Sequence, residues 1–312
     1  MSRNQVAKIF LVLGLLVLAY AAVRLVGGDG QRSSGGRDIG AAVTADVDLI
    51  RVTGPGEQSV ELARDGDGWT VNGYPADTVL VGAASSGMDT ARMGRLVARS
   101  ATNHARLGVA DDSTRLVEVV PTSGPAISFL LGGRGLEGRY VRFPGENDVF
   151  VVANESVATL DGTVEEWRDR IVAAVDTASV TRILVQRSDE GQTALARTEA
   201  DSATVEWIGD GEAADAVVVG TLLESVAELS ADGFPSDSVA FAVDFEQPAA
   251  VLDVYGSDVV GAPPVLSLLF LTAPDARDFL VRRADNPLVY RLSAARVEDL
   301  LPSRARLFPE AQ

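Results

Sequence analysis

The chain has 312 residues, of which 46% are hydrophobic and 23% are charged, so it is long enough for two domains and apolar enough to bury a core in each. Its formal net charge of −17 at pH 7 disfavours a general nucleic-acid binder, because such a surface repels the phosphate backbone. The absence of cysteine excludes disulfides, iron–sulfur clusters and thiol catalysis, and the single histidine leaves no histidine-rich metal site.

The N-terminal segment has the pattern of a membrane anchor. An unbroken apolar run extends from Ile9 to Val23, after two basic side chains, and Leu25 and Val26 continue it beyond Arg24. If Arg24 snorkels, the stretch is long enough to cross a bilayer core of about 30 Å. We therefore expect a transmembrane helix within residues 1–27 of a single-pass inner (cytoplasmic) membrane protein, with its bulk in the periplasm or extracytoplasmic space.

A cleaved signal peptide is the alternative for the same segment. Ala19-Tyr20-Ala21 fits the A-x-A cleavage pattern after a short apolar core. Both alternatives export the remainder of the chain. Residues 28–45, rich in glycine and serine, are expected to form a flexible linker.

Residues 46–176 are predicted to form a first α/β repeat. Strands are predicted at Asp48–Val52, Ser59–Arg64, Trp69–Val71, Leu116–Val120, Ala126–Leu131, Tyr140–Phe143 and Val149–Val152. Helices are predicted at Met88–Ser100 and Val164–Ala174. The Ala/Gly-rich stretch Val81–Gly87 is expected to depart from a plain helix.

Residues 177–312 repeat this order of elements. Strands are predicted at Arg182–Gln186, Thr193–Arg197, Val205–Trp207, Val239–Phe245, Ala250–Tyr255, Val265–Leu271, Phe279–Arg283 and Leu288–Leu292. Helices are predicted at Ala216–Leu229 and from Val297 to Leu301.

Two aromatic landmarks recur at nearly one spacing in the two halves. Trp207 stands 138 residues after Trp69, and Tyr290 stands 140 residues after Phe150. We therefore predict an α+β fold in which a mostly antiparallel β-sheet module, with one or two helices per repeat, is duplicated in tandem after one transmembrane helix.

Motifs for catalysis or cofactors lack their structural context. His104, the only histidine, has no G-x-S-x-G partner, and Gly133–Gly138 matches G-x-G-x-x-G but precedes a predicted strand instead of a helix. Its glycines fit a hairpin turn, as does Asp65–Gly68, which lacks the later glutamate of a calcium loop. Lys8 is the only lysine, so the folded part has none for a Schiff base. We expect no enzyme activity, no cofactor and no metal.

Candidate contacts to a ligand or partner come from aromatic and arginine side chains. Trp69 and Trp207 each follow a strand and a turn, where they serve either as stacking platforms or as packing residues of a small sheet, and packing is the usual role. With Arg142 and Arg282 they would rim a groove between the repeats.

The arrangement resembles the domain-of-unknown-function 4340 family. The matching features are the N-terminal anchor, the first strand with Leu49-Ile-Arg-Val52, the turn Asp65-Gly-Asp-Gly-Trp69, the hairpin Gly138–Arg142 and the helix with Glu166-Trp-Arg-Asp-Arg170. The resemblance covers nearly all of the chain after the linker. Members are commonly encoded beside gliding-type ABC transporter components. The resemblance implies an accessory role beside an ABC transporter permease and a gliding-type auxiliary subunit, and it supplies no catalytic residues.

The expected function is a non-enzymatic extracytoplasmic accessory or scaffold of an ABC-type transport system. The alternative is a binding module for an envelope glycan, peptide or lipid. The membrane is contacted through the N-terminal helix, and nucleic acid is not expected as a partner.

Overall fold

A computed structural model describes Ile39 and residues 46–56, 59–201, 204–259, 261–274 and 277–309. The transmembrane helix predicted within residues 1–27 lies outside the described residues, as does nearly all of the predicted linker. In the part of the chain that is described, no helix has the length and apolarity needed to cross a membrane.

The described chain is a mixed α/β structure dominated by two large antiparallel sheets. The first sheet has nine strands in the order β4-β3-β2-β1-β6-β7-β8-β9-β5. They are β1 (Val47–Thr53), β2 (Val60–Asp65), β3 (Gly68–Val71), β4 (Tyr74–Pro75), β5 (Leu96–Ala98), β6 (Arg115–Pro121), β7 (Ile127–Arg134), β8 (Arg139–Arg142) and β9 (Val149–Val152).

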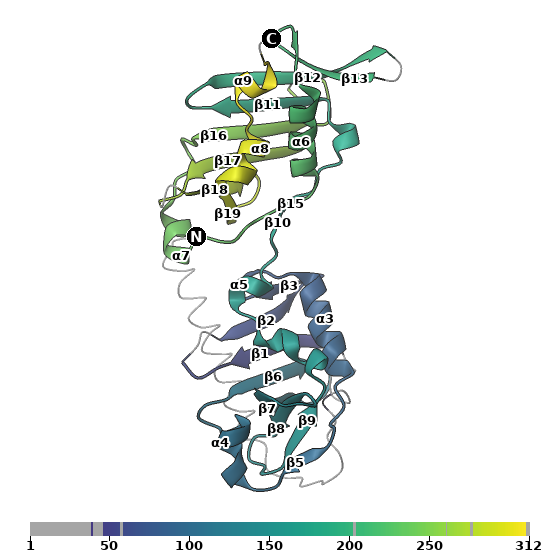
Figure 1. Cartoon of the computed structure of the whole chain (residues 1–312), viewed down its shortest axis with the longest axis vertical. Helices are drawn as coiled ribbons and strands as arrows, with labels where there is room; N and C mark the ends of the chain where they lie inside the picture. Colours follow the sequence, from purple (N-terminus) through teal and green to yellow (C-terminus); the bar gives the residue numbers. More distant parts are fainter. Residues whose placement is uncertain are drawn as a thin grey trace.

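The second sheet has eight strands in the order β14-β13-β12-β11-β16-β17-β18-β19. They are β11 (Arg182–Arg187), β12 (Gly191–Asp201), β13 (Thr204–Gly209), β14 (Glu212–Ala213), β16 (Ala250–Tyr255), β17 (Leu266–Thr272), β18 (Asp278–Arg283) and β19 (Val289–Ser293). Strand for strand, this order repeats that of the first sheet, except that β5 has no counterpart. A small ribbon of β10 (Ile171–Ala173) and β15 (Leu229–Ser230) lies between the sheets (Figure 1).

Few helices accompany the sheets, and Figure 1 shows them gathered mainly on one face of each. The α-helices are α3 (Thr78–Asp89), α4 (His104–Leu107), α5 (Val164–Trp167), α6 (Ala216–Ala227), α7 (Asp237–Ala242), α8 (Ala294–Leu300) and α9 (Arg304–Leu307). Short 3-10 helices are η1 (Ala101–Asn103), η2 (Asn154–Ser156), η3 (Ala158–Asp161) and η4 (Thr177–Ser179). We call the nine-stranded sheet with α3–α5 the first module, and the eight-stranded sheet with α6–α9 the second module.

The aromatic landmarks of the sequence occupy the same register positions in the two modules. Trp69 pairs with Arg64 across β2 and β3, and Trp207 pairs with Arg197 across β12 and β13. At the other end of each sheet, Phe150 pairs with a valine of β8 and Tyr290 pairs with a valine of β18. The spacing seen in the sequence therefore reflects equivalent places in two sheets of one plan.

The turn that leads from each sheet into its long helix is also repeated. Asn72 and Asp210 adopt positive φ, each before a glycine, in the tight turns that close β3–β4 and β13–β14. Asp77 and Asp215 then accept hydrogen bonds from two backbone N–H groups at the starts of α3 and α6. Both helices have 12 residues.

Each module encloses its own hydrophobic core. In the first, Ile50, Leu62 and Phe129 are fully buried among the residues that α3 covers. In the second, Ile183 and Leu195 take the cross-strand positions of Ile50 and Leu62. Burial of these apolar faces is the main force that fixes each sheet against its helices.

Two helices predicted for the first module have other bounds in the structure. The helix predicted at Met88–Ser100 begins earlier, at Thr78, and β5 occupies part of the predicted range. The stretch Val81–Gly87 is helical because Asp77 caps the first turn, and Val81 and Met88 are buried on one face. The predicted helix Val164–Ala174 ends at Trp167.

The strand predicted at Val239–Phe245 was also wrong. These residues lie mostly in α7, which starts after Ser236 and leaves the Phe241 side chain 87% exposed. A short run of alternating apolar residues is compatible with a strand or with a single helical turn, so this pattern could not distinguish the two structures.

Candidate functional site

The two modules meet where Tyr74 of β4, an edge strand of the first sheet, contacts the start of α7, and the segment before α7 packs on Tyr290 of β19, an edge strand of the second sheet. The connecting chain is tied by backbone hydrogen bonds. Asp77 N donates to Trp167 O at 2.8 Å, and Asp169 N donates to Pro75 O at 2.9 Å. On the other side, Ala231 N donates to Arg170 O at 2.7 Å. Arg168 is therefore held between these anchor points.

The Arg168 guanidinium is stacked between one aromatic ring from each module. Its carbon lies 3.9 Å from the Tyr74 ring centroid and 3.5 Å from that of Phe234. Phe234 in turn contacts Tyr290 of β19, with ring centroids 5.8 Å apart. Such cation–π contacts gain strength when the charge is partly desolvated, so this stack joins the modules.

The side chain of Arg168 has stacking partners but no hydrogen-bond acceptor. Among the described residues, none forms a hydrogen bond or an ion pair with its guanidinium. Burial lowers the pKa of Arg168 from its usual value, although Tyr74, Asp237 and other nearby groups act in the opposite direction. The N–H donors of Arg168 are not fully buried, so solvent or a ligand can reach them.

A cleft of about 870 Å³ opens beside this stack, and we call it the junction cleft. Its walls come from the ends of β1 and β2, the β3–β4 turn, the start of α5, and the segment before α7. The lining residues are Val52, Gly54, Val60, Asn72, Gly73, Tyr74, Arg115, Gly162, Thr163, Val164, Glu165, Arg168, Phe234, Pro235, Ser236 and Asp237.

A hydrogen bond across the junction cleft joins the two modules directly. The Tyr74 hydroxyl donates to Asp237 Oδ1 at 2.6 Å, with the carboxylate on the first residue of α7. This hydrogen bond, followed by burial, raises the pKa of the Tyr74 hydroxyl above its ordinary value. The carboxylate of Asp237 is thus engaged by tyrosine and forms no ion pair with Arg168.

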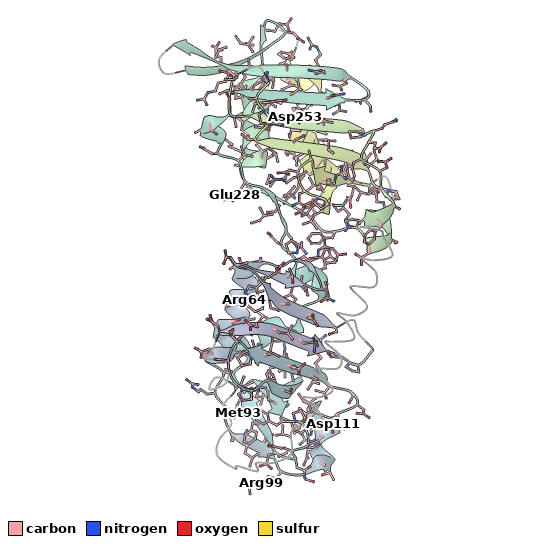
Figure 2. The ribbon with its side chains drawn as sticks, turned by 180° about the vertical axis from the view of Figure 1, so that it is seen from behind. Arg64, Met93, Arg99, Asp111, Glu228 and Asp253 are labelled. Carbon is pink, nitrogen blue, oxygen red and sulfur yellow. The ribbon has the colours of Figure 1, made fainter. Side chains whose placement is uncertain are left out.

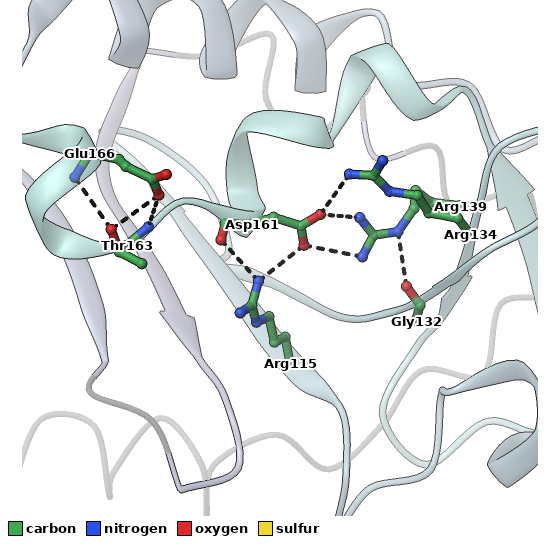
Figure 3. Close-up of polar contacts among 7 residues, drawn as sticks. All are labelled: Arg115, Gly132, Arg134, Arg139, Asp161, Thr163 and Glu166. Carbon is green, nitrogen blue, oxygen red and sulfur yellow. Dashed lines mark hydrogen bonds and ion pairs between the residues drawn. The ribbon is translucent and has the colours of Figure 1, made fainter.

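Beside the cleft, three arginines converge on the single carboxylate of Asp161 (Figure 3). Arg139 Nη1 lies 2.5 Å from Oδ2, Arg115 Nη1 lies 3.1 Å from Oδ1, and Arg134 is at 3.4 Å. Although burial alone raises the pKa of Asp161, the hydrogen bonds and charges of these arginines, led by Arg139, hold it below its ordinary value.

The Arg139 side chain is only 7% exposed, and its Nε also donates to Gly132 O at 2.9 Å. Next to the cluster, the side chain of Thr163 and that of Glu166 form the capping box that starts α5 (Figure 3). The cluster thus fixes the segment that carries Arg168.

The four residues predicted as ligand or partner contacts do not line one groove. Trp69 is partly buried with Arg64 over its ring at 5.4 Å, whereas Trp207 is 7% exposed within the core of the second module. Trp69 lies on β3, near the junction, and Trp207 lies on β13, at the far side of the second sheet (Figure 1). Neither tryptophan lines the junction cleft.

The two predicted arginines occupy equivalent positions on β8 and β18 but differ in their surroundings. Arg142 is 1% exposed and donates to Val109 O, Glu146 O and the Asp111 carboxylate. Figure 2 shows Asp111 toward the end of the first module opposite to Arg64. Arg282 lies over the Phe245 ring, and its buried Nε has no hydrogen-bond partner.

The remaining motifs have structural roles. His104 is 8% exposed, with Nε2 3.1 Å from Asn147 O. The glycines of Gly133–Gly138 form the β7–β8 hairpin, as the sequence predicted, and Gly138 has φ of 147°. The stretch Asp65–Gly68 closes the β2–β3 hairpin. No group of three or more histidine, aspartate or glutamate side chains in the described ranges is arranged to hold a metal ion.

Sequence reasoning missed the residues that form the junction cleft. Arg168 was noticed only within the helix motif Glu166–Arg170, and Tyr74, Phe234 and Asp237 were not singled out. Tyr74 is 163 positions from Asp237, so no local pattern could bring them together. One signal was available, because Tyr74 directly follows the Asn72-Gly73 turn, at the sheet edge.

Comparisons with known proteins place the chain in a family. A family model described as domain of unknown function (DUF4340) matches residues 69–248, which is more than half of the chain. The chain therefore belongs to the DUF4340 family. No curated protein and no solved structure matches it. The matched region includes Arg168, Phe234 and Asp237 of the junction cleft.

Proposed function

We propose that this DUF4340 family member is a non-enzymatic extracytoplasmic scaffold, an accessory of an ABC-type transport system in the bacterial envelope. The observation that carries the proposal is the pair of sheets with one strand order, joined through a packed junction. Two like modules in line present an extended surface of repeated plan, which suits a protein that holds several partners near a membrane.

The same observation supports tandem duplication as the origin of residues 46–176 and 177–312. Equivalent cross-strand pairs, equivalent capped helices and equivalent positive-φ turns recur in the same order. Independent origins of two sheets would not be expected to share these local details. The proposed anchor within residues 1–27 rests on the apolar run of the sequence.

Partners are proposed from the family resemblance. An ABC transporter permease and a gliding-type auxiliary subunit are the expected contacts, with the membrane reached through the N-terminal helix and the modules in the periplasm or extracytoplasmic space. The excess of acidic side chains makes a basic partner surface the better electrostatic match.

Affinity purification of the tagged full-length chain from gently solubilised native membranes, followed by mass spectrometry, tests this role. Permease, ATPase and auxiliary subunits should be recovered together. The matched control replaces residues 1–27 with a cleavable signal peptide, so that the modules are exported without an anchor. A full-length protein that is always recovered alone would refute the scaffold role.

A second candidate function is favoured by the junction cleft. A cleft of this size falls in the usual range for small-ligand sites, and its lining mixes aromatic rings with charged groups. This supports a binding module for an envelope glycan, peptide or lipid. Retention of such a ligand by the purified chain, with no protein partner, would favour this candidate.

A further inference from the structure

We propose that the junction cleft binds a ligand through a carboxylate group, and that the Arg168 guanidinium receives this carboxylate. The inference deepens the second candidate function and does not depend on the scaffold role. Copurification of transporter subunits can fail while carboxylate binding succeeds, and the reverse can also occur.

The first step of the argument is that Arg168 is positioned but unsatisfied. The guanidinium carbon lies over the rings of both Tyr74 and Phe234, which restrict its orientation, while its N–H donors make no hydrogen bond within the described residues. A planar fork of N–H groups matches the two oxygens of a carboxylate with two parallel hydrogen bonds. Because the rings have already fixed the side chain, little further conformational entropy is lost when the anion binds.

Two other arginines of this chain, one fully buried and one partly buried, do find acceptors. Arg142 donates to two carbonyl oxygens at 2.8 and 2.9 Å and pairs with Asp111. Arg187 donates to Leu301 O at 2.9 Å and pairs with Asp189 at 3.0 Å. Arg182 and Arg282 also lie over an aromatic ring without an acceptor among the described residues, at 4.0 and 4.6 Å. Arg168 differs from them because two rings hold it and because it lines a cleft, where a ligand can supply the partner that polar groups normally have.

The second step is that the acidic residues of the cleft do not supply this partner. Asp237 accepts the Tyr74 hydroxyl, and the Glu165 carboxylate lies close to Gly233, where an added Cβ would be 3.0 Å from Oε1. Both remain negative neighbours of the cleft. They would repel a doubly charged phosphate more strongly than a single carboxylate, and this favours a monocarboxylate ligand.

The third step compares Arg168 with the residue at the equivalent position of the second module, which is uncharged. Asp77 N donates to Trp167 O, and Asp215 N donates to Leu307 O, so Arg168 and Phe308 follow equivalent residues. Phe308 packs on the core of the second module. An apolar residue therefore satisfies the module plan at this position, and the arginine is specific to the junction.

Binding of defined probes to the full-length chain in detergent tests the proposal. The probes are a pool of N-acetylated tripeptides with free C-terminal carboxylates, the same pool with amidated C-termini, and a disaccharide that contains a uronic acid. Calorimetry should detect binding of at least one acid probe, and amidated peptides should bind at least tenfold more weakly than their acids. Binding by the peptide acids or by the uronide identifies the source of the carboxylate, and either result supports the site.

Two variants connect the binding to the residue. Arg168→Met should weaken acid binding at least tenfold, because it removes a charge-assisted pair of hydrogen bonds but keeps an apolar stem between the rings. Arg170→Met removes a neighbouring positive charge outside the cleft and should stay within twofold of the original protein. The comparison of acid with amide needs no variant, so it stands even if Arg168→Met fails to fold.

Two outcomes would overturn the proposal. One is that no acid probe binds, or that acid and amide bind equally. The other is that Arg168→Met, with a normal thermal transition, binds the acids as well as the original protein does.

Discussion

Replacement of Asp161 by asparagine tests whether one carboxylate stabilises the first module by neutralising a cluster of three arginines. Asp161→Asn keeps the shape of the side chain but removes the charge that faces Arg115, Arg134 and Arg139. The most affected group is Arg139, which is 7% exposed and would keep Gly132 O and at most one neutral amide oxygen as acceptors in place of a carboxylate.

The magnitude follows from burial. Removal of one partner from a fully buried ion pair costs about 3–5 kcal/mol, because the other charge is left uncompensated. The Asp161 side chain is 31% exposed, so water replaces part of what is lost. We expect a loss of about 2 kcal/mol in the free energy of unfolding of the first module, or about 5–10 °C in its midpoint temperature.

The pH dependence has a defined sign. The pKa of Asp161 is lower in the folded chain than in the unfolded chain. Its stabilisation is therefore complete above the unfolded value of about 3.9 and is lost as pH falls through the folded pKa. Between about pH 5 and pH 2, Asp161→Asn should lose less stability than the original protein does.

Guanidinium denaturation followed by tryptophan fluorescence measures this loss. Trp69 and Trp167 report on the first module, and the variant Trp207→Phe removes the reporter of the second. The matched control is Glu137→Gln in the same module, whose partner Arg95 forms an exposed pair worth about 0–1 kcal/mol. Equal losses in the two variants, or an unchanged pH profile, would refute the reasoning.

Three further predictions concern local structure and the junction. Asp77→Ala and Asp215→Ala each remove the N-cap of a helix, and each should lower the free energy of unfolding of its own module by about 1 kcal/mol in denaturant. A loss of stability in both modules from either variant would show that the two caps do not act independently. Gly138→Ala should prevent folding of the first module, because a Cβ would lie 1.9 Å from Val152 O, whereas Gly145→Ala, in open space, should cost about 1 kcal/mol by the same assay. Tyr74→Phe removes the 2.6 Å hydrogen bond to Asp237 of α7 and should speed proteolysis of the segment that connects the modules. The effect is expected at neutral pH, because the raised pKa of the Tyr74 hydroxyl keeps it protonated there. An unchanged rate of proteolysis would show that the stacking of Arg168 between Tyr74 and Phe234 is enough to hold the modules.

Most strands of both sheets could be predicted from the sequence because alternation of apolar residues is a local signal. Ile50 and Leu62 point into one core for the same reason that Ile183 and Leu195 do, and this alternation is visible in each segment. The nearly equal spacings from Trp69 to Trp207 and from Phe150 to Tyr290 predicted a repeated order of elements, and both pairs take equivalent register positions in the two sheets.

Prediction was wrong where a short segment carries two compatible patterns. The residues around Phe241 alternate like a strand, yet they form α7, whose Asp237 meets Tyr74 from the other module. Val81–Gly87 is rich in glycine and alanine, yet it is helical because a capping aspartate and buried contacts outweigh the propensity of glycine.

The sequence by itself determined the strand patterns, the two aromatic landmarks, the hairpin glycines and the family motif, because each depends on residues close together in the chain. Only the tertiary structure decided that Trp207 is a core residue and that Arg142 is satisfied internally. It also decided the candidate site, because the stack of Tyr74, Arg168 and Phe234 forms only when the edges of two separate sheets meet. No periodicity within one module specifies that contact, since it depends on how the modules pack.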